Sequence, residues 1–164
     1  MLKSLSLCCL LIAAVVGVAN KASFASGTHD ASPHHELKAY GQPGDPKKVK
    51  RTVTVLGTEI AFDAREMTFK RGETVRFIFV NKGEQPHEFM IGDAETQEEH
   101  RKMMQEMAGT DVASMGHVDP NTVSAEPGEK KELVLTFTKP GKFEFACNYP
   151  GHAEVGMQGV IIVK

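Results

Sequence analysis

Short runs of alternating hydrophobic and polar residues follow one another from residue 51 to the end of the chain. The alternation is clearest in 75–79, 133–137 and 143–147, where every second side chain is apolar or a cysteine. This period of two residues is typical of a β-strand with one buried face. We therefore predict strands in seven runs: 51–56, 59–62, 66–69, 74–81, 132–138, 142–147 and 159–164.

Glycine and proline turns separate several of these runs, for example at Asn81-Lys82-Gly83, Pro127-Gly128 and Lys139-Pro140-Gly141. Short strands with frequent turns favour an antiparallel β-sandwich or barrel. One segment differs, because residues 93–108 (DAETQEEHRKMMQEMA) hold helix formers throughout and neither Gly nor Pro. The pattern therefore predicts an all-β fold with one helix inserted between strands.

The first 25 residues have the features of a secretory signal peptide. Lys3 precedes an apolar run at 5–18, and Ser23-Phe24-Ala25 places small residues where a signal peptidase cleaves. The run is shorter than the roughly 20 residues of a membrane-spanning helix. We expect residues 1–25 to be removed, the mature protein to be periplasmic, and no membrane anchor to remain.

Residues 26–50 lack apolar periodicity and are rich in Gly, Pro, Ser and His, which predicts a flexible N-terminal arm. Its His29, His34 and His35 offer loose metal binding, although a solvated tail is the commoner outcome for such a segment. The rest of the chain, 51–164, is long enough for one domain with one core.

The charge balance and the cysteine content restrict the classes of function that this chain could have. The 164 residues include 19 Lys and Arg against 21 Asp and Glu, and cleavage after residue 25 leaves 17 against 21. This acidic balance argues against a nucleic-acid binder. Cleavage also removes Cys8 and Cys9, so Cys147 remains alone, and an unpaired cysteine in an exported protein is expected to be buried or bound.

The segment CNYPGHAEVGM places Cys147, His152 and Met157 five positions apart, and His87 follows the strong strand at 74–81. Two imidazoles, one thiolate and a weak distant thioether suit a copper ion that alternates between Cu(I) and Cu(II). Zinc prefers a harder fourth ligand than methionine, and iron–sulfur clusters need more cysteines. Each residue alone is compatible with simple packing, but the combination favours a metal site.

His87 together with Cys147-x4-His152-x4-Met157 resembles the type 1 copper pattern of the cupredoxins over residues 50–164. The stretches PHEFMIG and FEFACNYPGH, with the His-bearing arm, are most similar to small periplasmic cupredoxins associated with copper tolerance (CopI-like). The resemblance implies a Greek-key β-sandwich with one type 1 copper at one end. It implies His87, Cys147, His152 and Met157 as the ligands.

Two residues depart from the pattern of this family. Glu88 follows His87 where several members carry an Asn or Ser that ties the two ligand loops together, which leaves that hydrogen bond in doubt. Asn148 follows Cys147 where some relatives have an aromatic residue implicated in a second electron route, and this sequence does not support that route.

The resemblance implies electron transfer, and we predict that a redox partner protein docks near His152. The residues around it, Pro150, Gly151, Ala153, Val155 and Gly156, would form an apolar docking patch, although they are equally compatible with a tight loop that has no docking role. We expect a monomer that is not an enzyme. No Ser/His/Asp or paired-carboxylate pattern stands out, and one ligand set in one domain argues against a copper oxidase or nitrite reductase.

Copper handling is the alternative function. The helix at 93–108 spaces its soft side chains on one face, and two more follow in the next loop; the six are His100, Met103, Met104, Met107, Met115 and His117. Thioethers and imidazoles bind Cu(I), so these residues form a candidate second site for sequestering or delivering it. Packing of the methionines against the sandwich is the favoured explanation of the stripe.

Overall fold

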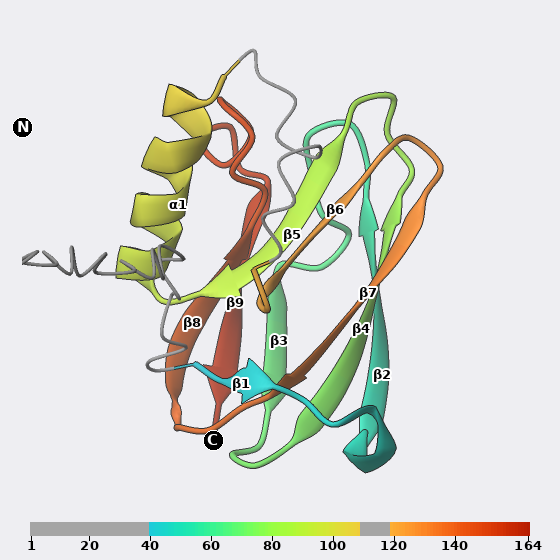
Figure 1. The fold of residues 1–164 in the computed structure, drawn as a ribbon, viewed down its shortest axis with the longest axis vertical. Coiled ribbons are helices and arrows are strands. Elements are labelled where there is room, and N and C mark those ends of the chain that lie inside the picture. The colour runs from blue at the N-terminus through green and yellow to red at the C-terminus, as the bar shows by residue number, and fades with distance from the viewer. Residues whose placement is uncertain (1–39, 109–118) are drawn as a thin grey trace, which may run out of the picture. The chain divides into compact units, whose positions relative to one another are not determined.

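The computed structural model describes residues 40–108 and 119–164, which form two packed β-sheets and one α-helix (Figure 1). The predicted signal peptide, the arm up to residue 39, Met115 and His117 lie outside the described residues. Among the residues described, no helix is long and apolar enough to cross a membrane.

The first sheet has four strands in the order β1-β7-β4-β2. Its strands are β1 (Gln42–Pro43), β2 (Arg51–Gly57), β4 (Thr74–Asn81) and β7 (Lys130–Thr136), and a short 3-10 helix, η1 (Pro46–Lys48), lies between β1 and β2. The second sheet has five strands in the order β3-β9-β8-β5-β6. They are β3 (Glu66–Phe69), β5 (His87–Gly92), β6 (Thr122–Ala125), β8 (Gly141–Ala146) and β9 (Gln158–Val163).

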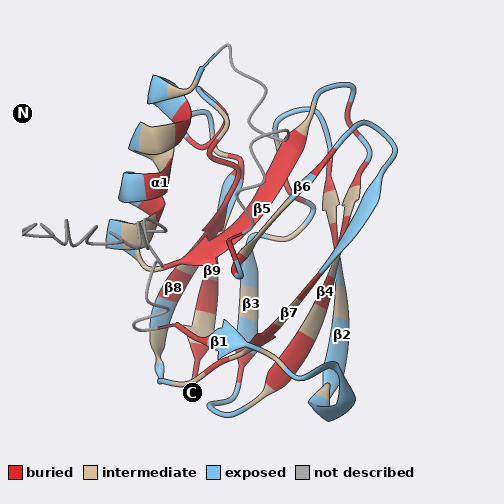
Figure 2. Ribbon diagram, viewed as in Figure 1, coloured by how far each residue is buried: buried red, intermediate tan, exposed pale blue. Residues whose placement is uncertain are grey.

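The core lies between the sheets and confirms the alternation seen in the sequence (Figure 2). Val75, Phe77 and Phe79 of β4 are fully buried, and the corresponding faces of β7 and β8 are buried too. All phenylalanines of the described residues belong to this core: Phe62, Phe69, Phe77, Phe79, Phe89, Phe137, Phe143 and Phe145. Their rings meet mostly edge to face or tilted, which aromatic pairs prefer.

The predicted inserted helix is confirmed as α1 (Ala94–Glu106), directly after β5. Its first turn is capped by Asp93, whose carboxylate accepts a hydrogen bond from the backbone N–H of Thr96 at 2.9 Å. The helix covers the outer face of the five-stranded sheet beside β5 and β8 (Figure 1). Its buried residues are Gln97, His100 and Met104, so the contact with the sheet is largely polar.

The predicted β-sandwich is confirmed, but not all of its strand pairs are antiparallel. β2 pairs with β4 in parallel, and β3 pairs with β9 in parallel. For β2 and β4 the reason is that the chain passes to the second sheet for β3 and returns to the first sheet for β4. These two strands therefore become neighbours that run in the same direction.

One predicted strand needs correction, and two strands lie outside the seven predicted runs. Residues 59–62 form a turn closed by the Thr58 N–H to Ala61 carbonyl hydrogen bond, with only an isolated bridge between Gly57 and Phe62. Strands β5 and β6 were not predicted. All six residues of β5 are buried because the core covers one face and α1 the other, so no alternation of hydrophobic and polar residues marks it.

The flexible arm was predicted to reach residue 50, but residues 40–50 are part of the domain. Gln42 and Pro43 pair with β7. Tyr40 is 1% exposed, packs its ring edge against Phe143, and accepts a hydrogen bond from Asn121 at 3.0 Å. A single buried aromatic residue anchors this segment, which lacks the periodicity that reveals a strand.

Candidate metal centre

Cys147 directly follows β8 and continues its inward-facing row after Phe143 and Phe145. Its side chain is fully buried. The backbone N–H of Glu88 donates to the Cys147 sulfur at 3.3 Å, which links the end of β8 to the start of β5. The sulfur therefore sits inside the sandwich, at the end where the chain turns into the loop that follows.

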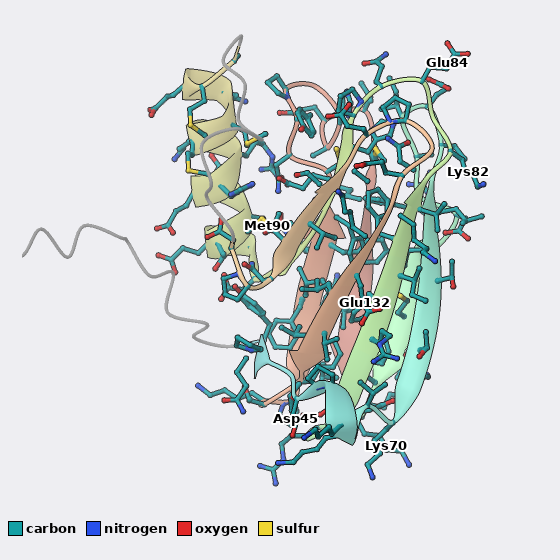
Figure 3. The ribbon with its side chains drawn as sticks, turned by 45° about the vertical axis from the view of Figure 1, so that its right-hand side comes forward. Asp45, Lys70, Lys82, Glu84, Met90 and Glu132 are labelled. Atoms are coloured by element: carbon teal, nitrogen blue, oxygen red, sulfur yellow. The ribbon has the colours of Figure 1, made fainter. Side chains whose placement is uncertain are left out.

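His87 begins β5 and comes from a loop that Asn81 organises. The Asn81 side chain donates to the carbonyls of Gln85 and Ala125 and accepts from the N–H of Gly83. A Cβ at Gly83 would lie 2.8 Å from His87 Nε2, so only glycine allows the ring this position. Lys82 and Glu84 of this loop lie at one end of the sandwich, and Asp45 and Lys70 lie at the other (Figure 3).

The loop 148–156 is held by its own backbone. The N–H groups of His152, Val155 and Gly156 each donate to a carbonyl three or four residues earlier. At its base the Cys147 N–H donates to the Met157 carbonyl at 3.0 Å, and the Met157 N–H donates to the His152 carbonyl at 2.9 Å. Gly151 and Gly156 have φ of 87° and 106°, which favours glycine. The arrangement fixes His152 and Met157 relative to Cys147.

These segments bring His87, Cys147 and His152 together, with one ligand atom of each lying within 4.8 Å of the others. The Cys147 sulfur is 3.4 Å from His152 Nδ1 and 3.9 Å from His87 Nδ1. Metal–nitrogen and metal–sulfur bonds of roughly 2.0–2.3 Å separate two ligands of one ion by about this much. Met157 is fully buried in the same core cluster as Cys147. One copper ion fits this donor set.

The protonation of these groups suits metal binding. Burial raises the pKa of the Cys147 thiol to about 12, so without a metal the thiol keeps its proton. Burial, together with the charge of His152, lowers the pKa of His87, and burial lowers that of His152. Both imidazoles are then neutral at pH 7 and able to bind an ion.

Comparison with known proteins decides the family. Residues 49–164 match the family of copper-binding proteins described as plastocyanin/azurin. The chain belongs to this family. It is a cupredoxin, and its sandwich and helix agree with the fold that the sequence motif implied.

Among its relatives, the cupredoxin is 39% identical to the copper-resistant cuproprotein CopI of Pseudomonas aeruginosa, covering 82% of this chain and 87% of that protein. It is 42% identical to CopI of Rubrivivax gelatinosus, over 82% of this chain and 79% of that one. A solved structure of auracyanin from Roseiflexus castenholzii is 25% identical, with a TM-score of 0.58, and matches 71% of this chain and 98% of its own.

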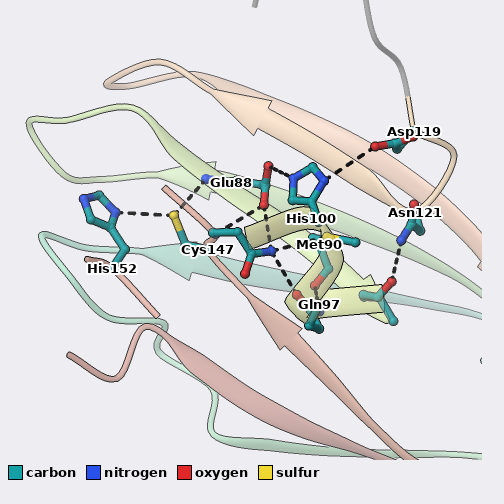
Figure 4. A network of polar contacts seen from close by, with 10 residues as sticks. Glu88, Met90, Gln97, His100, Asp119, Asn121, Cys147 and His152 are labelled. Carbon is teal, nitrogen blue, oxygen red and sulfur yellow. Dashed lines mark hydrogen bonds and ion pairs between the residues drawn. The ribbon is translucent and has the colours of Figure 1, made fainter. Parts of the chain in front are cut away.

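The sequence left in doubt whether the residue after His87 ties the two ligand loops together. In the structure the side chain of Glu88 makes this connection (Figure 4). Its carboxylate is buried and accepts hydrogen bonds from the backbone and side-chain nitrogens of Asn148 at 3.3 and 3.1 Å. Its other oxygen lies 2.9 Å from His100 Nε2. Asn148 is therefore a structural residue of the site. The signal at Glu88 was a charged residue directly before the apolar run Phe89-Met90-Ile91, but the sequence did not show which groups it meets.

His100 does not turn toward the methionines of its helix. Nε2 meets Glu88, and Nδ1 lies 3.7 Å from Asp119 (Figure 4). Burial lowers the pKa of His100, but the hydrogen bond and charge of Glu88, with the charge of Asp119, raise it by more, so that it lies above its usual value. Met104 is buried, whereas Met103 and Met107 are half-buried. A Cu(I) site on this face stays a prediction.

Proposed function

We propose that this cupredoxin is an exported electron carrier that holds one redox-active copper with His87, Cys147, His152 and Met157, and that it serves copper tolerance. The supporting observation is the buried cluster of two imidazole nitrogens and one thiol, with Met157 hydrogen-bonded through its backbone to Cys147. Copper bound there would supply one-electron chemistry between Cu(I) and Cu(II).

The protein's part in this function is to hold the ligands in one geometry in both oxidation states. Cys147 and His87 stand at the ends of paired strands, and the loop that carries His152 is closed by backbone hydrogen bonds. Such a preorganised frame keeps ligand movement small when an electron enters or leaves. Met157, as the weak ligand, would adjust the reduction potential.

His152 is the proposed point of electron entry. It is 9% exposed, whereas His87, Cys147 and Met157 are all 0% exposed. The exposed large hydrophobic residues of the described chain are Val155, at 66%, and Ile60, at 42%. Val155 lies on the loop of His152, and Ile60 on the turn 58–61, whose Thr58 carbonyl borders the space beside His87. We propose that a redox partner docks on these side chains. Ala153, included in the predicted patch, is buried.

Copper tolerance, export and the absence of catalysis rest on other support. Two relatives near 40% identity are named copper-resistant cuproproteins. The N-terminal signal pattern supports a periplasmic location, and the single ligand set supports a carrier that is not an enzyme. We propose that it acts as a monomer. Sequestration or delivery of Cu(I) is the second candidate function, and the half-buried Met103 and Met107 favour it.

The test combines electrochemistry with growth. The mature protein, loaded with copper, should hold one copper per chain and show a reversible one-electron wave, and its gene should restore growth of a copper-sensitive deletion strain. A Cys147→Ser variant should fail in both assays. Restoration of growth by a Cys147→Ser protein that shows no redox wave would reject electron transfer as the basis of tolerance and favour Cu(I) binding.

A further inference from the structure

A buried carboxylate joins the two segments that carry the copper ligands. Glu88 is adjacent to His87 in the sequence, and its side chain reaches Asn148, which is adjacent to Cys147. The two segments are 60 residues apart in the chain. Because the Glu88 N–H also donates to the Cys147 sulfur, this one residue contacts the ligand loop through both its backbone and its side chain.

The helix α1 completes this arrangement. His100 binds the second carboxylate oxygen of Glu88, and Gln97 accepts from the side-chain nitrogen of Asn148 at 2.9 Å. Gln97 also donates to the carbonyls of Met90 and Glu144, on strands β5 and β8. The helix is thus hydrogen-bonded to Glu88 and to Asn148, the residues that follow the ligands His87 and Cys147 in the sequence.

A buried carboxylate is costly unless each oxygen is hydrogen-bonded, and a buried ion pair often adds little stability over apolar packing. Glu88 is 2% exposed and His100 is 4% exposed, so both have left water. Their hydrogen bonds are directional and admit one arrangement of the groups they join. The benefit of the pair is therefore geometric rather than a gain in stability.

We propose that Glu88 is a positioning residue for the copper site, that it fixes Cys147 relative to His87 through Asn148, and that helix α1 holds it through His100. Glu88 touches no ion and acts through the ligand loop. The helix is accordingly part of the copper site's support. This inference rests on the proposed copper site.

The test compares Glu88→Gln and Glu88→Ala with Glu84→Ala, which removes an exposed carboxylate three residues before His87. Each protein is loaded with copper, and its affinity, visible band and reduction potential are measured. Glu88→Ala should lose about 10–100-fold in copper affinity, as outer hydrogen-bond partners of metal ligands do. Its band and potential should also shift. For Glu88→Gln, whose amide oxygen still accepts from Asn148, the affinity, band and potential should lie between those of Glu88→Ala and those of the wild type.

His100→Ala supplies an independent measurement far from the ligands in sequence. It should shift the band and potential away from their wild-type values, whereas Lys102→Ala, on the exposed side of the same helix, should not. If Glu88→Ala does not fold, Glu88→Gln and His100→Ala still decide the matter. If Glu88→Gln and His100→Ala both kept the copper affinity, visible band and reduction potential of the wild type, the proposal would be overturned. Failure of the wild-type protein itself to bind copper would instead reject the proposed function.

Discussion

Cys147 lies where β8 ends, and the Glu88 N–H donates to its sulfur. The Nδ1 atoms of His87 and His152 lie within 4 Å of the same sulfur. Its identity as a candidate ligand could be predicted because it is the single cysteine after residue 25, at fixed spacing from His152 and Met157. The role of Glu88 could not. A charged residue beside a ligand has no pattern that reveals which buried groups it meets.

Replacement of Met157 tests the weak ligand. Met157→Leu keeps nearly the same volume in the core but removes the thioether. Copper should stay bound by the remaining three ligands, and the reduction potential should rise because Cu(II) loses a donor. Voltammetry of the copper-loaded variant checks this. Loss of all copper, or a lower potential, would contradict the role given to Met157.

The raised pKa of Cys147, about 12, predicts that copper displaces a proton from its thiol. The pKa values of both histidines are lowered, so at pH 8 they carry no proton to release. Calorimetric titration with Cu(II) in buffers of different ionisation enthalpy should therefore show about one proton released per copper.

The same titration gives a pH dependence. Histidines with lowered pKa values become protonated only below their usual range, so the released protons should begin to exceed one per copper only below the ordinary histidine pKa of 6.5. Zero release at pH 8 would indicate that the metal-free site already holds a thiolate, which a buried thiol without a cation would not do.

At the scale of single elements, α1 was predictable from its composition, but its contact with the sheet was not. The Met stripe indicated a soft or apolar face, whereas the residues that bind the sheet most closely are Gln97 and His100. Their partners lie on β5 and β8 and after β8, and pairings between distant segments leave no local periodicity.

Leucine in place of Met103, Met104 and Met107 tests whether this helix also binds Cu(I). Since carboxylates face both ring nitrogens of His100, we expect the helix to have a packing role. The triple variant should keep the copper stoichiometry, visible band and tolerance of the wild type, at a cost below about 1.5 kcal/mol per site. Loss of a second Cu(I) together with loss of tolerance would instead establish a handling site.

The segment before β2 offers a second test at this scale. Tyr40→Ala should lower the free energy of unfolding by roughly 3–5 kcal/mol, as for other buried aromatic residues, whereas Tyr40→Phe should cost about 1 kcal/mol for the lost hydrogen bond with Asn121. Denaturant unfolding measures both. A Tyr40→Ala protein as stable as the wild type would show that residues 40–50 are dispensable for the domain.

At the scale of the whole molecule, the sandwich could be predicted because β4, β7 and β8 each bury every second side chain. The parallel pairs β2–β4 and β3–β9 could not, since alternation shows which face of a strand is buried but not which strand lies beside it. That the ligands meet at one end of the sandwich was predicted from the resemblance of the ligand motif to the cupredoxins.

The visible spectrum of the purified mature protein, with its copper content, tests the central claim most directly. A short covalent bond between the Cys147 sulfur and Cu(II) should give the oxidised protein an intense visible absorption, with one copper per chain, that disappears on reduction. Cys147→Ser should abolish this absorption. A colourless oxidised wild-type protein that contains copper, or a Cys147→Ser variant that keeps the colour, would contradict the assignment of Cys147 as the thiolate ligand of a type 1 copper.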